Sequence, residues 1–313
     1  MSRIGLGTAP LGNLFEAVDD DESIAVVHAA WERGVRFFDT APLYGHGLAE
    51  RRLGRALASR ARDEAIVCTK VGRVLDPATG ARPDTVFRDV PPVDPVYDYS
   101  RDGVLRSIEE SLERMGLDRF DIVHVHDPDD HEHEALATAF PTLIELRDQG
   151  VITRVGCGMN QVAMLSRFVD AVDLDCILLA GRWTLLDRTG AALLAQCAAR
   201  GVDVILGGVF NSGLLASANP ELGATFDYTA APPALVAQAR RLADVCASFG
   251  VTLPAAAIQF ALRTSGIDTV LVGARSVDEI AADLDFAAVP IPDALWVTVD
   301  DLHEESSASD VAP

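Results

Sequence analysis

Lysine is almost absent from this sequence. Of its 26 lysine and arginine residues only one, Lys70, is a lysine. A coding bias toward arginine explains the other basic residues, but it does not explain why one ammonium group is kept. An ammonium is a compact charge whose pKa shifts readily, whereas a guanidinium stays protonated. This difference makes Lys70 a candidate functional residue.

Cysteine is also scarce, and its pattern argues against a disulfide framework. The five cysteines are odd in number, scattered along the chain and mostly set inside apolar runs. Such a pattern predicts buried free thiols in a reducing compartment, and it lacks the spacing of a zinc site. We therefore expect a cytoplasmic protein. The cysteines are Cys68, Cys157, Cys176, Cys197 and Cys246.

Long hydrophobic runs are missing as well. No window approaches about 18 uninterrupted apolar residues, and the N-terminus lacks the basic start and apolar stretch of a signal peptide. The formal net charge of −21 disfavours nucleic-acid and membrane-surface partners, because so acidic a chain repels phosphate backbones and anionic lipids. Hydrophobic residues at 49% and charged residues at 23% are typical of a globular protein with a large core.

The sequence does contain a regular alternation of short apolar runs and longer helical patterns. Apolar strands that alternate with helices are typical of a parallel sheet, and eight such units in about 300 residues favour a single closed (β/α)8 TIM barrel. No G-x-G-x-x-G motif follows the first run, which disfavours a Rossmann fold. The predicted strands are Ile4–Leu6, Val35–Phe38, Ala65–Thr69, Asp121–Val125, Thr153–Gly156, Cys176–Leu179, Asp203–Leu206 and Thr269–Val272. The predicted helices include Glu22–Arg33, Leu48–Ser59, Arg101–Met115, Glu134–Gln149, Met164–Val172 and Ala191–Arg200.

Two connections are much longer than the others. Val71–Tyr99 follows the third strand and Phe210–Pro233 follows the seventh. In a barrel both emerge at the C-terminal face, so we expect them to cover the substrate. The polar stretch Asp300–Pro313 is predicted to form a loose tail, which leaves residues 1–299 for the barrel.

Polar residues follow three successive predicted strands at the ends where barrel enzymes place their active sites. Asp39 and Tyr44 follow the second strand, Lys70 follows the third and His126 follows the fourth. A phenol has a pKa near about 10, and a nearby ammonium lowers it. Asp39 can hold Lys70 as an ion pair, and His126 can hydrogen-bond the reacting oxygen. Such a set suits proton transfer coupled to hydride transfer with a nicotinamide cofactor.

These residues stand in runs that closely resemble the aldo-keto reductases over nearly the full length. The runs are Asp39-Thr-Ala-Pro-Leu-Tyr44-Gly45, Thr69-Lys70, Leu112-Glu-Arg-Met-Gly-Leu117 and Asp121-Ile-Val-His-Val-His126. The resemblance implies that Asp39, Tyr44, Lys70 and His126 form a catalytic tetrad in which Tyr44 donates and accepts the proton. It also implies that Asn160 holds the nicotinamide carboxamide.

Within the family, the runs that begin at Ala180 and Gly207 are similar to those of the L-fucose and D-threo-aldose 1-dehydrogenases, as is the long insertion after Lys70. This likeness implies oxidation of an aldose of the L-fucose, D-arabinose or L-galactose type at C1 to the lactone. Reduction of a non-sugar aldehyde or ketone uses the same residues in reverse and stays open as an alternative.

The resemblance also implies a cofactor site, with departures from the usual pattern. The family's usual lysine and arginine at the eighth strand are replaced by Gly273 and Glu279. A carboxylate repels a 2′-phosphate and accepts from a ribose hydroxyl, so we expect NAD rather than NADP. In the family a tyrosine usually stacks on the nicotinamide ring, and this sequence has Gly207 at that position. Trp183 or Phe210 is therefore expected to supply an apolar cover beside the substrate. The predicted cofactor-binding residues are Thr8, Asn160, Gly207, Gly273, Ala274, Arg275, Ser276, Glu279 and Asp283.

A metal site is one alternative to this interpretation. His124 and His126, with His131 and His133, have the look of a ligand cluster, since barrel hydrolases use His-x-His at a strand end. Such sites also need ligands from later strands, and the only later histidine is His303 in the tail. We therefore expect no metal, with His131 and His133 solvated.

A second alternative is a non-catalytic regulatory subunit that binds nucleotide, as some barrels of this family do. The presence of both Tyr44 and Lys70 disfavours that role. The expected partner is a small-molecule sugar or carbonyl substrate, and the expected assembly is a monomer or small homo-oligomer. The chain also starts almost directly on the first strand, where the family usually has a short hairpin across the barrel floor.

Overall fold

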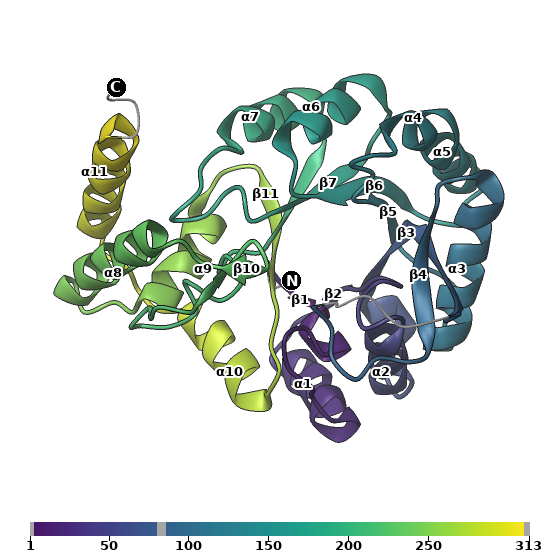
Figure 1. Ribbon diagram of the computed structural model, residues 1–313, viewed down its shortest axis with the longest axis horizontal. Coiled ribbons are helices and arrows are strands. Elements are labelled where there is room, and N and C mark those ends of the chain that lie inside the picture. The colour runs from purple at the N-terminus through teal and green to yellow at the C-terminus, as the bar shows by residue number, and fades with distance from the viewer. Residues whose placement is uncertain (1–2, 80–85, 310–313) are drawn as a thin grey trace.

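Eight parallel strands close into a barrel in the computed structural model, which describes residues 3–79 and 86–309 (Figure 1). The barrel strands are β1 (Ile4–Gly7), β2 (Phe37–Asp39), β3 (Ile66–Pro77), β5 (Ile122–His126), β6 (Arg154–Met159), β7 (Cys176–Ala180), β8 (Asp203–Gly207) and β11 (Ile267–Val272). The ring closes because β1 pairs with both β2 and β11. The predicted (β/α)8 barrel and its eight strands are confirmed.

Both faces of the barrel strands are buried. Side chains alternate between the two faces of a strand, and an inward set that includes Phe37, Cys68 and Ile122 forms an apolar cluster inside the barrel. Outward residues such as Val67 and Val123 join the main core beneath the helices. Strands buried on both faces are nearly continuous apolar runs, which is why the sequence pattern located them.

Helices surround the barrel, and their ends follow local sequence signals (Figure 1). The Ser100 hydroxyl accepts from the Gly103 N–H at the start of α3, and Gly116 ends that helix with a φ of 64°. The helices are α1 (Asp20–Glu32), α2 (Leu48–Leu57), α3 (Arg101–Met115), α4 (Glu132–Glu134), α5 (Phe140–Asp148), α6 (Val162–Ala171), α7 (Ala191–Arg200), α8 (Pro233–Ser248), α9 (Leu253–Arg263), α10 (Val277–Phe286) and α11 (Asp293–Ser309). Within the described ranges, no one helix is both long and apolar enough to cross a membrane. α8 and α9 meet the test only as a pair bent by 90°.

The helix predicted at Glu134–Gln149 is interrupted. Ala135–Ala139 forms a π-helical turn, and α5 begins only at Phe140. Pro141 has no N–H to donate to the preceding turn, so the regular α-helical hydrogen bonding cannot run through it. The sequence pattern showed the helix but not this break.

The prediction of a loose tail from residue 300 is wrong, because α11 continues to Ser309. Leu295, Trp296 and Val299 on α11 are buried in the cluster that also holds α8 residues, so packing stabilises the helix. Asp310–Pro313 lie outside the described residues. At the other end β1 is the first element of the described range.

The two long connections contain short antiparallel structure. β3 continues to Pro77 and pairs with β4 (Val93–Asp98), while residues 80–85 lie outside the described ranges. In the second connection β9 (Thr225–Phe226) pairs with β10 (Thr229–Ala230) across a two-residue turn. These hairpins, which the sequence did not reveal, carry residues to the C-terminal mouth of the barrel.

Candidate active site

The four residues of the predicted tetrad lie together at the C-terminal end of the barrel. Asp39 ends β2, Lys70 lies on β3 opposite β5, His126 ends β5 and Tyr44 stands in the turn after β2. The Lys70 ammonium is 4.7 Å from the centre of the Tyr44 ring. The His126 ring meets the Tyr44 ring edge-on, with 5.8 Å between their centres. The barrel therefore brings together the side chains that their strand-end positions indicated.

Lys70 is held by β2. Its Nζ donates to Asp39 Oδ2 at 2.6 Å and to the Thr40 carbonyl at 2.9 Å. The backbone of Asp39 is fixed in turn by Thr8, whose N–H and hydroxyl both donate to the Asp39 carbonyl. Lys70 is only 1% exposed, and charge-assisted hydrogen bonds are strong in so dry a setting. Thr8, predicted to bind cofactor, thus supports Asp39.

Electrostatics keep Lys70 charged and Tyr44 protonated. Burial lowers the pKa of Lys70, but Asp39 and Tyr44 outweigh it and hold that pKa above its usual value. Burial raises the pKa of Asp39, and Lys70 opposes the rise. Burial also raises the pKa of Tyr44 above its usual value, and Lys70 offsets only part of the rise. Lys70 therefore lowers the Tyr44 pKa as expected, but desolvation of the phenolate exceeds the attraction of the ammonium, and the pKa stays above its usual value.

His126 is a neutral imidazole in this setting. Burial, Arg73 and Lys70 depress its pKa well below the usual value. Its carbonyl accepts from the Tyr99 hydroxyl at 2.7 Å and from Arg73 at 3.4 Å, which fixes the end of β5. A neutral imidazole can donate one hydrogen bond to a substrate oxygen without bringing a charge.

Asp127 follows His126 directly and adds an acidic group to the wall of the site. Its backbone has a positive φ of 40°. Burial raises the pKa of Asp127 to about 6, while Arg73, whose guanidinium lies 3.7 Å from the carboxylate, opposes the rise. Asp127 therefore changes charge near the acidic end of the physiological range.

A buried ion pair stands behind Lys70. Glu50 on α2 is fully buried and accepts from Arg114 on α3 at 2.6 Å and from the Thr69 hydroxyl at 3.2 Å. The three residues join two helices to β3 next to Lys70. The sequence carried no signal for this pairing, because its partners are far apart in the chain.

A cavity of about 460 Å³ opens above the tetrad. Tyr44, Lys70, His126 and Asn160 are the predicted site residues in its wall. The remaining wall includes residues that the sequence analysis did not select, both polar (Arg73, Asp127, Asp129, Asn211, Ser212, Asp227) and apolar (Leu14, Val86, Phe87, Tyr228). Arg73 and Asp127 lie within three residues of the tetrad in the sequence, and this position could have marked them as candidate site residues. The others come from loops and had none.

The β9–β10 hairpin forms part of the cavity rim. Asp227 and Tyr228 form its turn and have φ values of 46° and 63°, as a type I′ turn requires. Arg182 anchors the turn with two hydrogen bonds to the Asp227 carboxylate, at 3.0 and 2.8 Å. The Nε of Arg182 also donates to the Asn160 carbonyl at 3.1 Å, so one guanidinium joins the hairpin to the loop that carries Asn160.

The predicted cofactor residues divide into two groups. Gly273, Ala274, Arg275, Ser276, Glu279 and Asp283 gather where β11 leads into α10. Asn160 lies in the cavity wall, and Gly207 ends β8 beside Gly208, which lines the cavity.

In the first group the charges are predominantly negative. Arg275 is engaged by two carboxylates, Glu16 at 2.9 Å and Glu279 at 3.3 Å. Ser276 caps α10 by accepting from the Glu279 N–H. Burial, with a further contribution from Glu279, raises the pKa of Asp283 to about 7.

The two predicted substrate contacts lie outside the set of residues that line the cavity. The indole N–H of Trp183 donates to Thr264, and its ring packs 5.4 Å from Phe260. Phe210 packs, partly buried, against the same core. The structure gives Trp183 a packing role, and contact of either residue with substrate stays a prediction.

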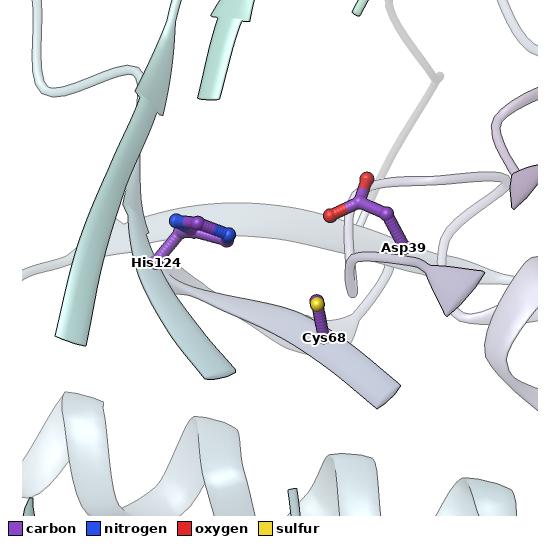
Figure 2. A group of neighbouring side chains, drawn as sticks. All are labelled: Asp39, Cys68 and His124. Carbon is purple, nitrogen blue, oxygen red and sulfur yellow. The ribbon is translucent and has the colours of Figure 1, made fainter. Parts of the chain in front are cut away.

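The structure does not gather the histidine cluster of the metal alternative. His131 instead packs its ring against Tyr97 and Tyr99. In the described ranges, a different trio has the composition of a metal site: Asp39, Cys68 and His124, whose candidate ligand atoms lie within 4.8 Å of one another (Figure 2). All five cysteines are free and buried, as expected.

The fold is a barrel, and the site gathers buried titratable side chains at the C-terminal mouth of that barrel. The model of the aldo/keto reductase family matches residues 3–304. The chain belongs to this family, and it is an oxidoreductase of the kind that uses nicotinamide cofactors.

Curated relatives cover nearly the whole chain. A D-threo-aldose 1-dehydrogenase from a Pseudomonas species is 42% identical over 94% of this chain and 91% of its own length. A pyridoxal 4-dehydrogenase from Microbacterium luteolum is 37% identical over 96% and 93%. An L-galactose dehydrogenase from Arabidopsis thaliana is 30% identical over 97% and 89%. The predicted family resemblance is confirmed, and the alternative of a non-catalytic subunit finds no support in these relatives.

Solved structures agree on the fold. An aldo-keto reductase from Bacillus halodurans, in its holo form, superposes with a TM-score of 0.75 at 23% identity and covers 96% of this chain and 92% of its own. At that identity the likeness bears on the fold alone.

Proposed function

We propose that this protein is an aldose 1-dehydrogenase that oxidises a sugar at C1 to the lactone with NAD. The observation that carries the proposal is the position of Tyr44, Lys70 and His126 at the base of a cavity whose wall is rich in charged side chains. Arg73 in that wall offers donors and the carboxylates offer acceptors, and a polyhydroxylated substrate needs both. The names of the relatives similar at 42% and 30% point to the same substrate class.

Tyr44 is proposed to move the proton. As a phenolate it takes the proton from the C1 hydroxyl of the sugar. A bound nicotinamide would supply the acceptor for the hydride from C1, so that the hemiacetal loses two hydrogens and becomes a lactone. Lys70 stabilises the phenolate, and Asp39 holds Lys70 in place at 2.6 Å. His126, neutral, donates to the reacting oxygen and orients it. Because burial raises the pKa of Tyr44, oxidation is expected to speed up as the pH rises.

The residues present fit a nicotinamide dinucleotide. Asn160 and Asn211 place two amides in the cavity wall, and the buried Asn211 Oδ1 has no hydrogen-bond partner in the structure. Such an acceptor suits the N–H of a carboxamide. Gly158, Gly181 and Gly208 line the same wall without side chains, which leaves room for a flat ring.

The residues at the start of α10 favour NAD over NADP. The one cation there, Arg275, already pairs with Glu16 and Glu279. A 2′-phosphate would have to displace these carboxylates or lie beside them, and both arrangements are unfavourable. A ribose hydroxyl can donate to Glu279 instead.

A second candidate substrate is an aromatic aldehyde or alcohol. Phe87 and Tyr228 line the cavity, and the rings of Tyr44 and Phe87 lie 6.3 Å apart. Aromatic walls bind flat rings well. A relative named pyridoxal 4-dehydrogenase, 37% identical, makes this candidate specific.

The test is a substrate panel measured by the absorbance of the reduced nicotinamide. L-fucose, D-arabinose, L-galactose and pyridoxal are each offered with NAD and with NADP. We expect turnover with at least one of the sugars and a lower KM for NAD than for NADP. If no alcohol or aldehyde produces a signal while the cofactor binds, the proposal fails; turnover of pyridoxal alone would favour the second candidate.

A further inference from the structure

A second histidine lies one layer deeper in the barrel than His126. His124 is fully buried on β5 and pairs in register with Lys70 on one side and with Gly156 on the other. A side chain at Gly156 would collide with the His124 ring, so the glycine makes room for it. His124 takes no part in the proposed proton transfer, and nothing in a purely apolar barrel core requires an imidazole.

Unsatisfied polar atoms gather around this ring. Neither nitrogen of His124 has a hydrogen-bond partner in the structure, and neither has Asp39 Oδ1, although all three atoms are buried. Figure 2 shows one carboxylate oxygen of Asp39 pointing toward His124, with the Cys68 sulfur below them. Burying a polar group without a partner costs about 1–3 kcal/mol. The Asp39 carboxylate and the His124 ring lie next to each other, so one small partner between them can serve both.

We propose that His124 is a positioning residue for Asp39, to which it is joined through one enclosed water. The water donates one hydrogen bond to Asp39 Oδ1 and forms a second hydrogen bond with a ring nitrogen of His124. With Oδ1 satisfied in this way, Oδ2 stays directed at Lys70, and Lys70 stays beside Tyr44. The inference rests on the proposed function, because the orientation of Asp39 affects turnover only if Lys70 and Tyr44 carry the proton transfer.

The dimensions of the trio suit a water. One atom from each of Asp39, Cys68 and His124 lies within 4.8 Å of the other two, so a single water beside them can reach all three side chains by hydrogen bonds. Water in a buried site needs two to four polar partners, and the carboxylate, the imidazole and the thiol supply them.

The electrostatics argue against a metal ion at the same place. Burial raises the pKa of the Cys68 thiol, so the sulfur is the neutral, weakly ligating form. The Lys70 ammonium already binds the same carboxylate and would repel a cation. Burial, Lys70 and Arg154 depress the pKa of His124 well below its usual value, so the ring is neutral and brings no charge of its own.

Removal of His124 has a predictable direction. Without the imidazole and its water, Lys70 is the main partner left to the Asp39 carboxylate. The ammonium is then drawn toward Asp39 and away from Tyr44. The Tyr44 pKa then rises further, because the offsetting ammonium is weaker at a greater distance. The groups that act on Tyr44 in this argument are Lys70, Asp39, Tyr228 and the neutral His126.

The experiment compares His124→Leu with His124→Gln in the full-length chain, using the substrate found in the panel. For His124→Leu we expect kcat for oxidation to fall about tenfold and the apparent pKa of its pH profile to rise by about half a unit to one unit, with both KM values unchanged. His124→Gln, whose amide can still bond the water, is expected to restore most of kcat and the wild-type profile. His28→Leu, at a partly buried histidine of α1, is the control and should behave as wild type.

Three outcomes would overturn the inference. A fall in kcat with an unmoved pH profile, or a glutamine variant no better than leucine, would make His124 a packing residue only. A stoichiometric metal present in the wild type and lost in His124→Leu would make the trio a metal site. If the wild type is active and both His124 variants have the same kcat and pH profile as the wild type, the positioning role is rejected and the proposed function stands. If the wild type shows no turnover at all, the proposed function is rejected as well.

Discussion

The floor and the rim of the cavity are built by different means. Lys70 and His126 in the floor, and Asp39 bound to Lys70, lie on strands and are at most 6% exposed. Each is tied by hydrogen bonds to neighbouring strands or loops. The rim is made by turns: Leu14 pairs with Phe87 in an isolated bridge, and Tyr228, 52% exposed, stands at the tip of a hairpin. Under the proposed function, the contrast means that the barrel fixes the residues of the chemistry, whereas substrate selection depends on loops that can change independently.

The largest expected difference in kcat is between two tyrosine-to-phenylalanine variants, one at the floor and one at the rim. Tyr44→Phe should lower kcat by about 10²–10⁴-fold, because it removes the proposed proton carrier while leaving the ring in place. Cofactor affinity, measured by fluorescence titration, should change little. Tyr228→Phe is the matched control and should keep most of kcat. Equal losses of turnover in the two variants would contradict the division between floor and rim.

The buried ion pair between Glu50 and Arg114, next to the cavity floor, is expected to stabilise the fold. Arg114→Leu leaves the fully buried Glu50 without its cationic partner, which should cost about 3–5 kcal/mol of the free energy of unfolding. Arg106→Leu on the same helix breaks ion pairs that are largely exposed, and about 0–1 kcal/mol is expected. Urea denaturation followed by circular dichroism measures both. Similar values for the two variants would show that Glu50 is not held as a buried ion.

The hydrogen bonds of Arg182 at the rim are expected to affect substrate binding more than stability. Arg182→Leu releases the Asp227 turn and the Asn160 carbonyl. We expect the KM for the sugar to rise about tenfold, because a rim turn without its anchor must be ordered when substrate binds. The free energy of unfolding should change by less than in Arg114→Leu. Asp227→Asn should reproduce a part of the rise in KM. A fall in kcat with an unchanged KM would contradict the assignment of this hairpin to the rim.

The smallest effect expected is a pH dependence of binding. Since burial raises the pKa of Asp127 to about 6, its carboxylate accepts from a sugar hydroxyl above that pH and loses this capacity as the pH falls below it. The KM for the sugar should therefore rise between about pH 7 and pH 5. Arg73, Asp129, His126 and Lys70 are the charged or titratable groups around it.

Steady-state kinetics of wild type and Asp127→Asn across this range provide the test. The variant should show a KM that no longer depends on pH. His126 does not account for the change, because its pKa is depressed well below this range. An equally steep dependence in Asp127→Asn would assign the effect to another group.

Prediction from sequence succeeded where one segment carried the whole signal. The barrel strands were found because burial on both faces makes each one a short apolar run, and the α3 termini because Ser100 and Gly116 act on their own helix. It failed where partners come from distant segments. The α11 helix is polar in sequence and is stabilised by burial of Leu295 and Val299 beside α8. The net rise in the Tyr44 pKa reflects the depth of its burial, which no local pattern gives.

By itself the sequence determined that a barrel forms and that Asp39, Tyr44, Lys70 and His126 occupy strand ends, because both follow from the alternation of elements along the chain. Only the tertiary structure decided what surrounds them. Glu50 meets Arg114, Arg182 meets Asp227 and His124 faces Asp39 across separations of 45 residues or more. Such pairs form when the closed barrel sets distant segments side by side, and their energies depend on burial and distance, which exist only in the folded chain.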